Sequence, residues 1–404
     1  MQTKNTYLSF IILIIIIFSC AGSSKNKKSV SKPTAFTQKQ EQKILPGAYQ
    51  INKYLPLLKD KRIAVVGNQT SEINLTHLVD TLLTLKVNIV KVFAPEHGFR
   101  GKASAGEYIK NATDIKTGLP IISLYGKHKK PSTNDLKNVD ILIFDIQDVG
   151  ARFYTYLSTL HYIMEAAAEQ NKKVIVLDRP NPNSDYIDGP IMQDSNKSFV
   201  GLHPVPVVYA MTIGEYAQMI NGENWLKNGV KTNLTIIKIK NYKHGDKYEL
   251  PVKPSPNLPN YQAIRLYPSL CLFEGTDISC GRGTNFQFQI YGSPKLPKGN
   301  FAFVPQPNKG SKWPKHQAKK CYGKDLRNIT PPTEFHIEWL IDAYQKYKHK
   351  ENFFNDFFMK LAGDSNLQTQ IINNTSVHEI RLSWQKKLMQ FKQIRQKYLL
   401  YLEN

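Results

Sequence analysis

Short apolar runs alternate with amphipathic stretches between residue 61 and about residue 240. This alternation is typical of βαβ units, in which helices cover a parallel sheet. The apolar runs predict strands over 62–67, 88–94, 119–124, 139–145 and 173–178. The amphipathic stretches predict helices over about 74–85, 155–170 and 212–221, the last with Thr212 and Glu215 as a capping box. We therefore expect an α/β domain with a mainly parallel sheet over residues 46–240.

The pattern changes from about residue 232: the apolar runs become short, and prolines are frequent from residue 251 on. Two amphipathic stretches near the end predict helices over about 332–348 and 379–402. This part reads as a smaller α+β domain over residues 241–404, joined to the first by a linker near 225–260. A chain of 404 residues is long enough for two such domains.

The first 45 residues have a different character. Lys4 precedes an apolar stretch over 7–18 that is too short to cross a membrane, and small residues follow it, so residues 1–19 read as an export signal. The segment 17–20 (IFSC) resembles a bacterial lipobox, which predicts a lipid on Cys20; a plain secretory signal with an incidental Cys20 is the alternative. Residues 20–45 are polar and predict a flexible tether. We expect an exported protein, lipid-anchored in the bacterial cell envelope and facing the periplasm.

The net charge bears on which partners we expect the protein to have. The 54 Lys and Arg residues against 32 Asp and Glu give a net charge of +22, which suits a polyanionic neighbour. The lysines are spread over the tether, residues 295–350 and the last predicted helix without a recognisable nucleic-acid module, so we expect no nucleic acid partner.

Besides Cys20, the chain has Cys271, Cys280 and Cys321; either the first two pair or all three are buried thiols.

Polar residues follow four of the predicted strands. The carboxyl ends of parallel strands meet at one edge of a sheet, and ligands bind there. The residues that this rule selects are Asn68, Glu96, His97, Arg100, Asp145, Asp148, Arg152, Tyr154 and Arg179. No glycine-rich phosphate-binding loop accompanies them, so we expect no nucleotide cofactor.

Glu96 directly follows an apolar strand, in a loop that Gly98 and Gly101 allow to turn tightly. A carboxyl group at the mouth of a sheet can serve as a general acid, or it can anchor its loop through backbone amides. His97 beside it can be a ligand or a packing residue. A metal site formed by Glu96, His97, Asp145 and Asp148 is conceivable, but no zinc-type spacing supports it, and we predict no metal.

Each of the remaining charged candidates for the site can have either a functional or a structural role. Asp145 or Asp148 can be the second carboxylate of a glycosidase pair, or can hold Arg152 in place. The arginines can bind a substrate carboxylate bidentately or pair with an acid of the chain. Residues 273–284, with Glu274 and Arg282, read as a loop that closes over a site or as a glycine-rich turn.

Five segments in order resemble one family: 94–101 (APEHGFRG), 144–156 (FDIQDVGARFYTY), 178–182 (DRPNP), 211–215 (MTIGE) and 273–284 (FEGTDISCGRGT). They are similar to the exo-lytic β-N-acetylmuramidases of the NamZ (YbbC-like) type, over about residues 45–404. Residues 285–288 (NFQF) depart from that pattern.

The resemblance implies a Rossmann-like domain followed by a smaller domain, with the site in the cleft between them. It implies a peptidoglycan-recycling glycoside hydrolase, without a cofactor, that releases N-acetylmuramic acid from the non-reducing end of peptidoglycan fragments. The family's proposed catalytic glutamate falls at Glu96, which would protonate the glycosidic oxygen. Asp145, Asp148, Tyr154 or the acetamido oxygen of the substrate would stabilise the transition state. The residues expected to bind substrate are Asn68, His97, Arg100, Arg152, Arg179, Glu274 and Arg282.

Two alternatives remain open at this point. The first is a non-catalytic envelope lipoprotein that binds muropeptides or another acidic saccharide. The second is a metal-dependent esterase that uses Asp145, Asp148 and His97.

Overall fold

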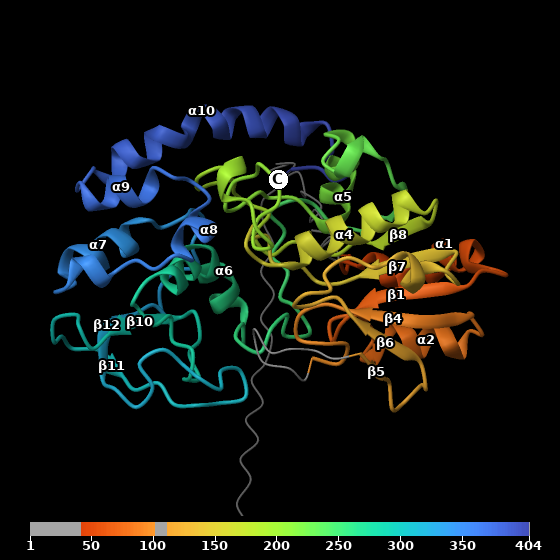
Figure 1. Cartoon of the computed structure of the whole chain (residues 1–404), viewed down its shortest axis with the longest axis horizontal. Coiled ribbons are helices and arrows are strands. Elements are labelled where there is room, and N and C mark those ends of the chain that lie inside the picture. The colour runs from red at the N-terminus through yellow and green to blue at the C-terminus, as the bar shows by residue number, and fades with distance from the viewer. Residues whose placement is uncertain (1–41, 102–110, 404) are drawn as a thin grey trace, which may run out of the picture. The chain divides into compact units, whose positions relative to one another are not determined.

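The computed structural model describes residues 42–101 and 111–403. The export signal, Cys20 and almost all of the tether lie outside these residues and stay predictions. Within the described residues, a seven-stranded sheet has the order β5-β6-β4-β1-β7-β8-β9 (Figure 1). Its strands are β1 (Ile63–Gly67), β4 (Ile89–Ala94), β5 (Ala112–Thr113), β6 (Pro120–Ser123), β7 (Ile141–Asp145), β8 (Lys173–Leu177) and β9 (Asn233–Ile237).

The five predicted strands are present as β1, β4, β6, β7 and β8, and they are parallel to one another. Two strands of this sheet were not predicted. The antiparallel edge strand β5 is only two residues long. The other edge strand, β9, is parallel to β8 and lies inside the predicted linker near 225–260, so that prediction is wrong here. Its side chains are mostly only partly buried, so it lacks the apolar run of a central strand.

Side chains of the central strands alternate between two cores, one on each face of the sheet. Ile63 and Val65 of β1 face a core built with α2 (Leu78–Thr84) and the short helix α1 (Ile51–Tyr54). Ala64 and Val66 face the other core, which includes residues of α3 (Thr133–Leu136), α4 (Tyr156–Glu169) and α5 (Ile213–Gly222). Helices therefore cover both faces, as the α/β prediction requires. The predicted capping box of α5 is confirmed by reciprocal hydrogen bonds between Thr212 and Glu215.

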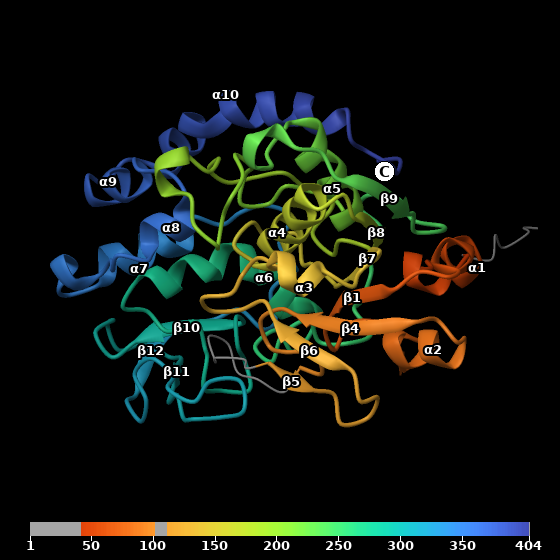
Figure 2. The ribbon, with the colours of Figure 1, turned by 45° about the vertical axis from the view of Figure 1, so that its right-hand side comes forward.

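The C-terminal part contains a three-stranded antiparallel sheet in the order β10-β12-β11 and several helices. Figures 1 and 2 show α10 and this sheet at opposite ends of the C-terminal part. Its elements are α6 (Tyr261–Leu270), β10 (Ile290–Ser293), β11 (Ala302–Phe303), β12 (Cys321–Asp325), α7 (Glu338–Lys346), α8 (Phe358–Ala362), α9 (Leu367–Ile372) and α10 (Val377–Gln396). A β2–β3 hairpin (Glu72–Ile73 and Thr76–His77) completes the strands of the described chain. A mainly parallel sheet followed by a smaller α+β part matches the predicted fold class.

The core that contains α4 and α5 continues without a break into α6, α7 and α10. Residues 43–404 form one compact unit by their contacts. The predicted boundary between two domains near residue 240 stays a prediction. Cys271, Cys280 and Cys321 are buried free thiols, which decides between the two cysteine alternatives. Across the described residues, no helix combines the length and apolar character needed to cross a membrane.

Arg152 joins the loop after β7 to the C-terminal helices. Its guanidinium is buried and donates to the carbonyl oxygens of Pro190 (2.6 Å) and Val205 (2.9 Å). On its other side it donates to the carbonyl oxygens of Leu361 (2.8 Å) and Ala362 (2.7 Å) in α8. Four protein acceptors on one buried side chain make Arg152 a structural cross-link. This arrangement does not favour the predicted role in binding substrate.

We predict that Arg152→Met lowers the free energy of unfolding by about 3 kcal/mol or more, because four buried carbonyl groups lose their donor. Urea unfolding followed by circular dichroism measures this change. The matched control is Arg62→Met, whose exposed ion pair with Asp140 should matter far less. Equal losses in the two variants would contradict the cross-link.

Candidate active site

The order of the six parallel strands places a topological switch point between β1 and β7. The chain leaves β1 toward β4 on one side and leaves β7 toward β8 on the other, so the carboxyl ends of the two strands open a crevice. Hydrogen bonds join the two loops that begin there. The hydroxyl of Thr70 donates to Asn68 Oδ1 (2.6 Å) and accepts from the backbone N–H of Gln147 (3.0 Å). Asn68 is therefore a fixed part of the loop, and its Nδ2 donates to the Tyr156 hydroxyl (2.8 Å).

Glu96 follows β4 at the same edge of the sheet and is partly buried. The Tyr125 hydroxyl donates to its Oε1 (3.1 Å), and the Thr155 hydroxyl donates to its Oε2 (2.9 Å). Tyr125 comes directly after the Leu124 that ends the next predicted strand, and Thr155 precedes α4. Three separate segments thus position one carboxyl group.

The backbone after Glu96 turns through the left-handed region. His97 has φ 70° and Gly98 has φ 78°. A positive φ at a non-glycine residue is strained, and such strain is common at functional sites. The tight loop predicted from the glycines is present, and His97 is buried in it.

Asp145 and Arg179 form an ion pair inside the protein. The guanidinium donates to both carboxylate oxygens, at 2.6 Å from Nε and 2.9 Å from Nη2, and both side chains are buried. This geometry favours a structural role for both residues. It does not favour a catalytic role for Asp145 or a substrate-binding role for Arg179.

Asp148 lies just beyond the end of β7 and is buried without a cation beside it. Its Oδ2 accepts from the backbone N–H of Gly150 (2.7 Å) and from the hydroxyl of Tyr209, while Oδ1 has no partner among the described residues. Burial raises the pKa of Asp148 to about 6, although these hydrogen bonds oppose the rise. It does not hold Arg152, whose partners are backbone carbonyl groups.

Arg100 is also bound within the protein. Its guanidinium donates twice to Asp114, at 2.8 and 2.7 Å, and lies 3.3 Å from Asp80. Two carboxylates already neutralise this cation. A further carboxylate from a substrate would have to compete with them.

A row of aromatic rings leads from the neighbourhood of Glu96 to the 273–284 segment. The rings of Tyr154 and Tyr156 meet edge to face at 4.7 Å, and Tyr267 lies 5.9 Å from Tyr154. Phe288 follows at 4.8 Å from Tyr267, and the Arg282 guanidinium lies over Phe288 at 5.1 Å. The carboxyl ends of the strands and the glycine-rich segment of the C-terminal part are therefore connected by direct packing.

Arg282 and Glu274 form an ion pair at the end of this row, and both are partly exposed. Burial alone would lower the pKa of Arg282, but the Glu274 carboxylate more than offsets this and raises it. The bonds to Glu274 use Nε and Nη2. Nη1 has no acceptor among the described residues, so Arg282 keeps a donor for a ligand.

Tyr156 connects Asn68 and Tyr154, because it accepts from Asn68 and packs edge to face on the Tyr154 ring, whose hydroxyl donates to the Pro254 carbonyl (2.7 Å). Burial and the nearby Glu96 carboxylate raise the pKa of Tyr156, so Glu96 lies close to the same group. The structure also shows residues that the sequence reasoning missed. Tyr125 follows a predicted strand at the same edge, so the rule of strand ends would have found it. Nothing in the sequence pattern indicates Tyr209.

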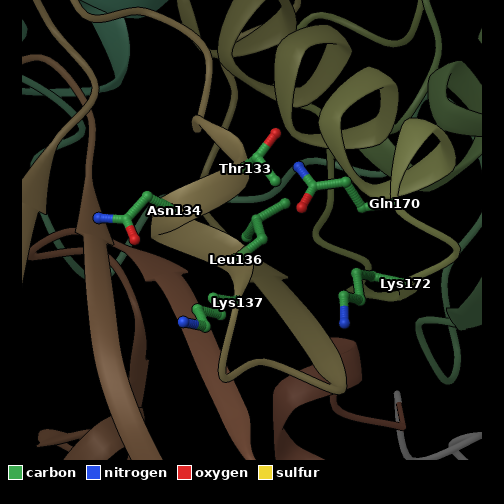
Figure 3. Close-up of a pocket in the computed structure, with 6 residues that line it drawn as sticks. All are labelled: Thr133, Asn134, Leu136, Lys137, Gln170 and Lys172. Carbon is green, nitrogen blue, oxygen red and sulfur yellow. The ribbon is translucent and has the colours of Figure 1, made fainter.

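A pocket lined by Thr133, Asn134, Leu136, Lys137, Gln170 and Lys172 lies elsewhere (Figure 3). These residues precede β7 and β8, at the amino ends of the strands. Ligands of this type of sheet bind at the carboxyl ends, so the pocket is not part of the candidate site. Among the described residues, no group of three or more His, Cys, Asp and Glu side chains could hold a metal ion.

Two family models match almost the whole described chain. Residues 63–262 match the N-terminal model, and residues 265–401 the C-terminal model, of the exo-β-N-acetylmuramidase NamZ. The chain belongs to the NamZ family. The resemblance drawn from the five segments is confirmed.

One relative of known activity and two solved structures are similar to this chain over most of its length. The peptidoglycan β-N-acetylmuramidase NamZ of Bacillus subtilis (strain 168) is 38% identical, covering 98% of this chain and 100% of its own length. A crystal structure of a DUF1343 family protein from Bacteroides fragilis matches with a TM-score of 0.84 and 45% identity, covering 90% of this chain and 100% of its own. A second one from the same species has a TM-score of 0.78 and 28% identity, covering 89% and 99%.

We predict that Asp148 makes the stability of this NamZ-family protein depend on pH. Its pKa rises from 3.8 to about 6 on folding, so the folded state binds the proton more tightly than the unfolded state. The free energy of unfolding, measured relative to Asp148→Asn, should therefore fall as the pH rises from about 4 to about 6, by up to about 1.4 kcal/mol per pH unit. Urea titrations at several pH values give both curves, and parallel curves would contradict the burial of a protonated Asp148.

Proposed function

We propose that this protein is an exo-acting glycoside hydrolase that releases N-acetylmuramic acid from the non-reducing end of peptidoglycan fragments. Membership of the NamZ family and the curated relative's activity support the reaction class. The observation that carries the proposal is the position of Glu96. It is a partly buried carboxyl group at the carboxyl edge of the sheet, held by hydroxyl donors from two other segments.

Glu96 acts as the general acid and then as the general base. In the first step its proton passes to the glycosidic oxygen as the bond to the anomeric carbon breaks. Tyr125 and Thr155 donate to the two oxygens of this carboxyl group and so fix its orientation. The same carboxylate then takes a proton from the water that attacks the sugar.

The second group has four candidates, three of them from the protein. Asp145 is bound to Arg179, Asp148 is buried with a raised pKa, and Tyr154 donates its hydroxyl to a backbone carbonyl. All three are buried. We therefore favour the acetamido oxygen of the substrate as the group that stabilises the positive charge at the anomeric carbon.

The lactyl carboxylate distinguishes N-acetylmuramic acid from N-acetylglucosamine, and a cation would recognise it. Arg152 and Arg179 are buried on protein acceptors, and Arg100 already faces two carboxylates. Arg282 is partly exposed and has Glu274 as its one carboxylate partner among the described residues. We propose that Arg282 binds the lactyl group, with the substrate lying between the strand ends and the 273–284 segment.

We predict that Glu96→Gln lowers kcat on a chromogenic β-N-acetylmuramide by at least about 100-fold, the usual effect of losing a general acid. The affinity for the substrate, measured by calorimetry, should change little, because Gln keeps an acceptor for one of the two hydroxyls. Glu169→Gln is the matched control, since Glu169 pairs with Lys130 at the far end of α4.

Unchanged turnover by Glu96→Gln would remove Glu96 from the mechanism. A native protein that binds the muramide and never cleaves it would instead support the non-catalytic envelope lipoprotein.

We further propose that the protein is exported and attached to the cell envelope through a lipid on Cys20. The support is in the sequence: Lys4, the apolar stretch over 7–18 and the small residues around Cys20. The acyl chains would hold the enzyme beside the polymer whose fragments it degrades. Cys20→Ser should move the protein from the membrane fraction to the soluble fraction, and an unchanged distribution would contradict the lipid anchor.

A further inference from the structure

Trp313 is a large aromatic side chain on the surface of the C-terminal part. It lies between β11 and β12, and 86% of it is exposed. Tryptophan is enriched at binding surfaces, because it combines a large apolar ring with one polar N–H group. Nothing in the proposed chemistry at Glu96 uses it.

The segment that carries Trp313 is fixed to the 273–284 segment. Lys315 Nζ donates to the carbonyl oxygens of Phe273 (3.1 Å) and Ile278 (3.1 Å), and also to that of Thr276. Pro314 packs so closely on Gly283 that a Cβ at position 283 would lie 2.5 Å from the Pro314 Cβ. The residues next to Trp313 are thus bound to the segment that contains Arg282, so the backbone that carries the ring has a defined place.

Hydrogen bonds also connect this segment to residues of the candidate active site. Asn257 Nδ2 donates to the Gly310 carbonyl (2.8 Å), three residues before Trp313. Pro254, three residues before Asn257, accepts from Gln69 Nε2 (3.1 Å) and from the Tyr154 hydroxyl (2.7 Å). The segment that carries Trp313 is therefore bound to the segment that contains Arg282 and, through residues 254–257, to Tyr154.

The charge around Trp313 suits an anionic chain. Residues 309–320 contain no acidic residue, and Lys319 and Lys320 in this segment are exposed. A peptidoglycan glycan without its peptides carries a lactyl carboxylate on every muramic acid residue. Sugar rings present a flat apolar face that stacks on indole, so one surface here matches both features of such a chain.

We propose that Trp313 is the stacking platform for the glycan that remains attached to the leaving side of the scissile bond. This inference rests on the proposed exo-acting function, in which only the terminal sugar is enclosed and the rest of the chain extends out of the site. The platform binds a sugar beyond the terminal muramic acid, so it distinguishes a glycan from a single sugar.

The test compares the affinities of Glu96→Gln and Glu96→Gln/Trp313→Ala by calorimetry. The first probe is a soluble tetrasaccharide of alternating N-acetylmuramic acid and N-acetylglucosamine, and the second is a chromogenic muramide. We expect the Kd of the tetrasaccharide to rise about tenfold and the Kd of the muramide to change less than twofold. Trp313→Phe in the same background should recover most of the lost affinity, because it keeps an aromatic face.

The matched control is Leu382→Ala, which removes a side chain that is 56% exposed on α10, at the opposite end of the C-terminal part (Figures 1 and 2). A tetrasaccharide Kd within twofold of the parent would overturn the inference, and so would an equal loss for both probes. The proposed function fails by a different result, namely that the native protein releases no sugar. The binding comparison does not depend on turnover, so the two failures can be told apart.

Discussion

The buried ion pair between Asp145 and Arg179 is the constraint on which the site depends. It joins the carboxyl end of β7 to the second residue after β8, at the carboxyl edge of the sheet. Removing one partner of such a pair leaves an uncompensated charge in the interior, at a cost of several kcal/mol. The backbone of Asp145 also accepts from the Ser71 hydroxyl, so the loop after β1 is held to the same point. The carboxyl ends of three strands therefore keep one arrangement, against which Glu96 is placed.

The charged residues at this edge divide into two kinds. Most of them bind groups of the protein: Arg152 binds four carbonyl oxygens, Arg100 binds two acids, and Asp148 is buried with a raised pKa. Glu96 and Arg282 differ, because Glu96 is held by hydroxyl groups and Arg282 has a single carboxylate partner among the described residues, and both are only partly buried. In this account the first kind builds a rigid frame, and the second kind meets the substrate. Lysines contribute most of the net charge of +22, and Lys319 and Lys320, in the segment that carries Trp313, are exposed.

Much of this could be predicted from the sequence, for physical reasons. Central parallel strands are buried on both faces, so they appear as apolar runs, and their carboxyl ends then select Glu96 and Asn68. The partners of the arginines could not be predicted, because a spacing along the chain does not show which carboxylate or carbonyl lies opposite in space. The same is true of Tyr209, which reaches Asp148 from 61 residues away. The edge strand β9 was missed because half-buried side chains give no continuous apolar run.

The proposed reaction is the removal of a terminal N-acetylmuramic acid from a glycan by this protein. The most direct measurement is mass spectrometry of the products that the protein lacking residues 1–45 releases from two short glycans. One glycan has N-acetylmuramic acid at its non-reducing end, and the other has N-acetylglucosamine there. We expect the first glycan to yield free N-acetylmuramic acid and a chain shortened by one sugar. We expect no sugar to be released from the second glycan. Internal cleavage, or equal release from both glycans, would contradict it.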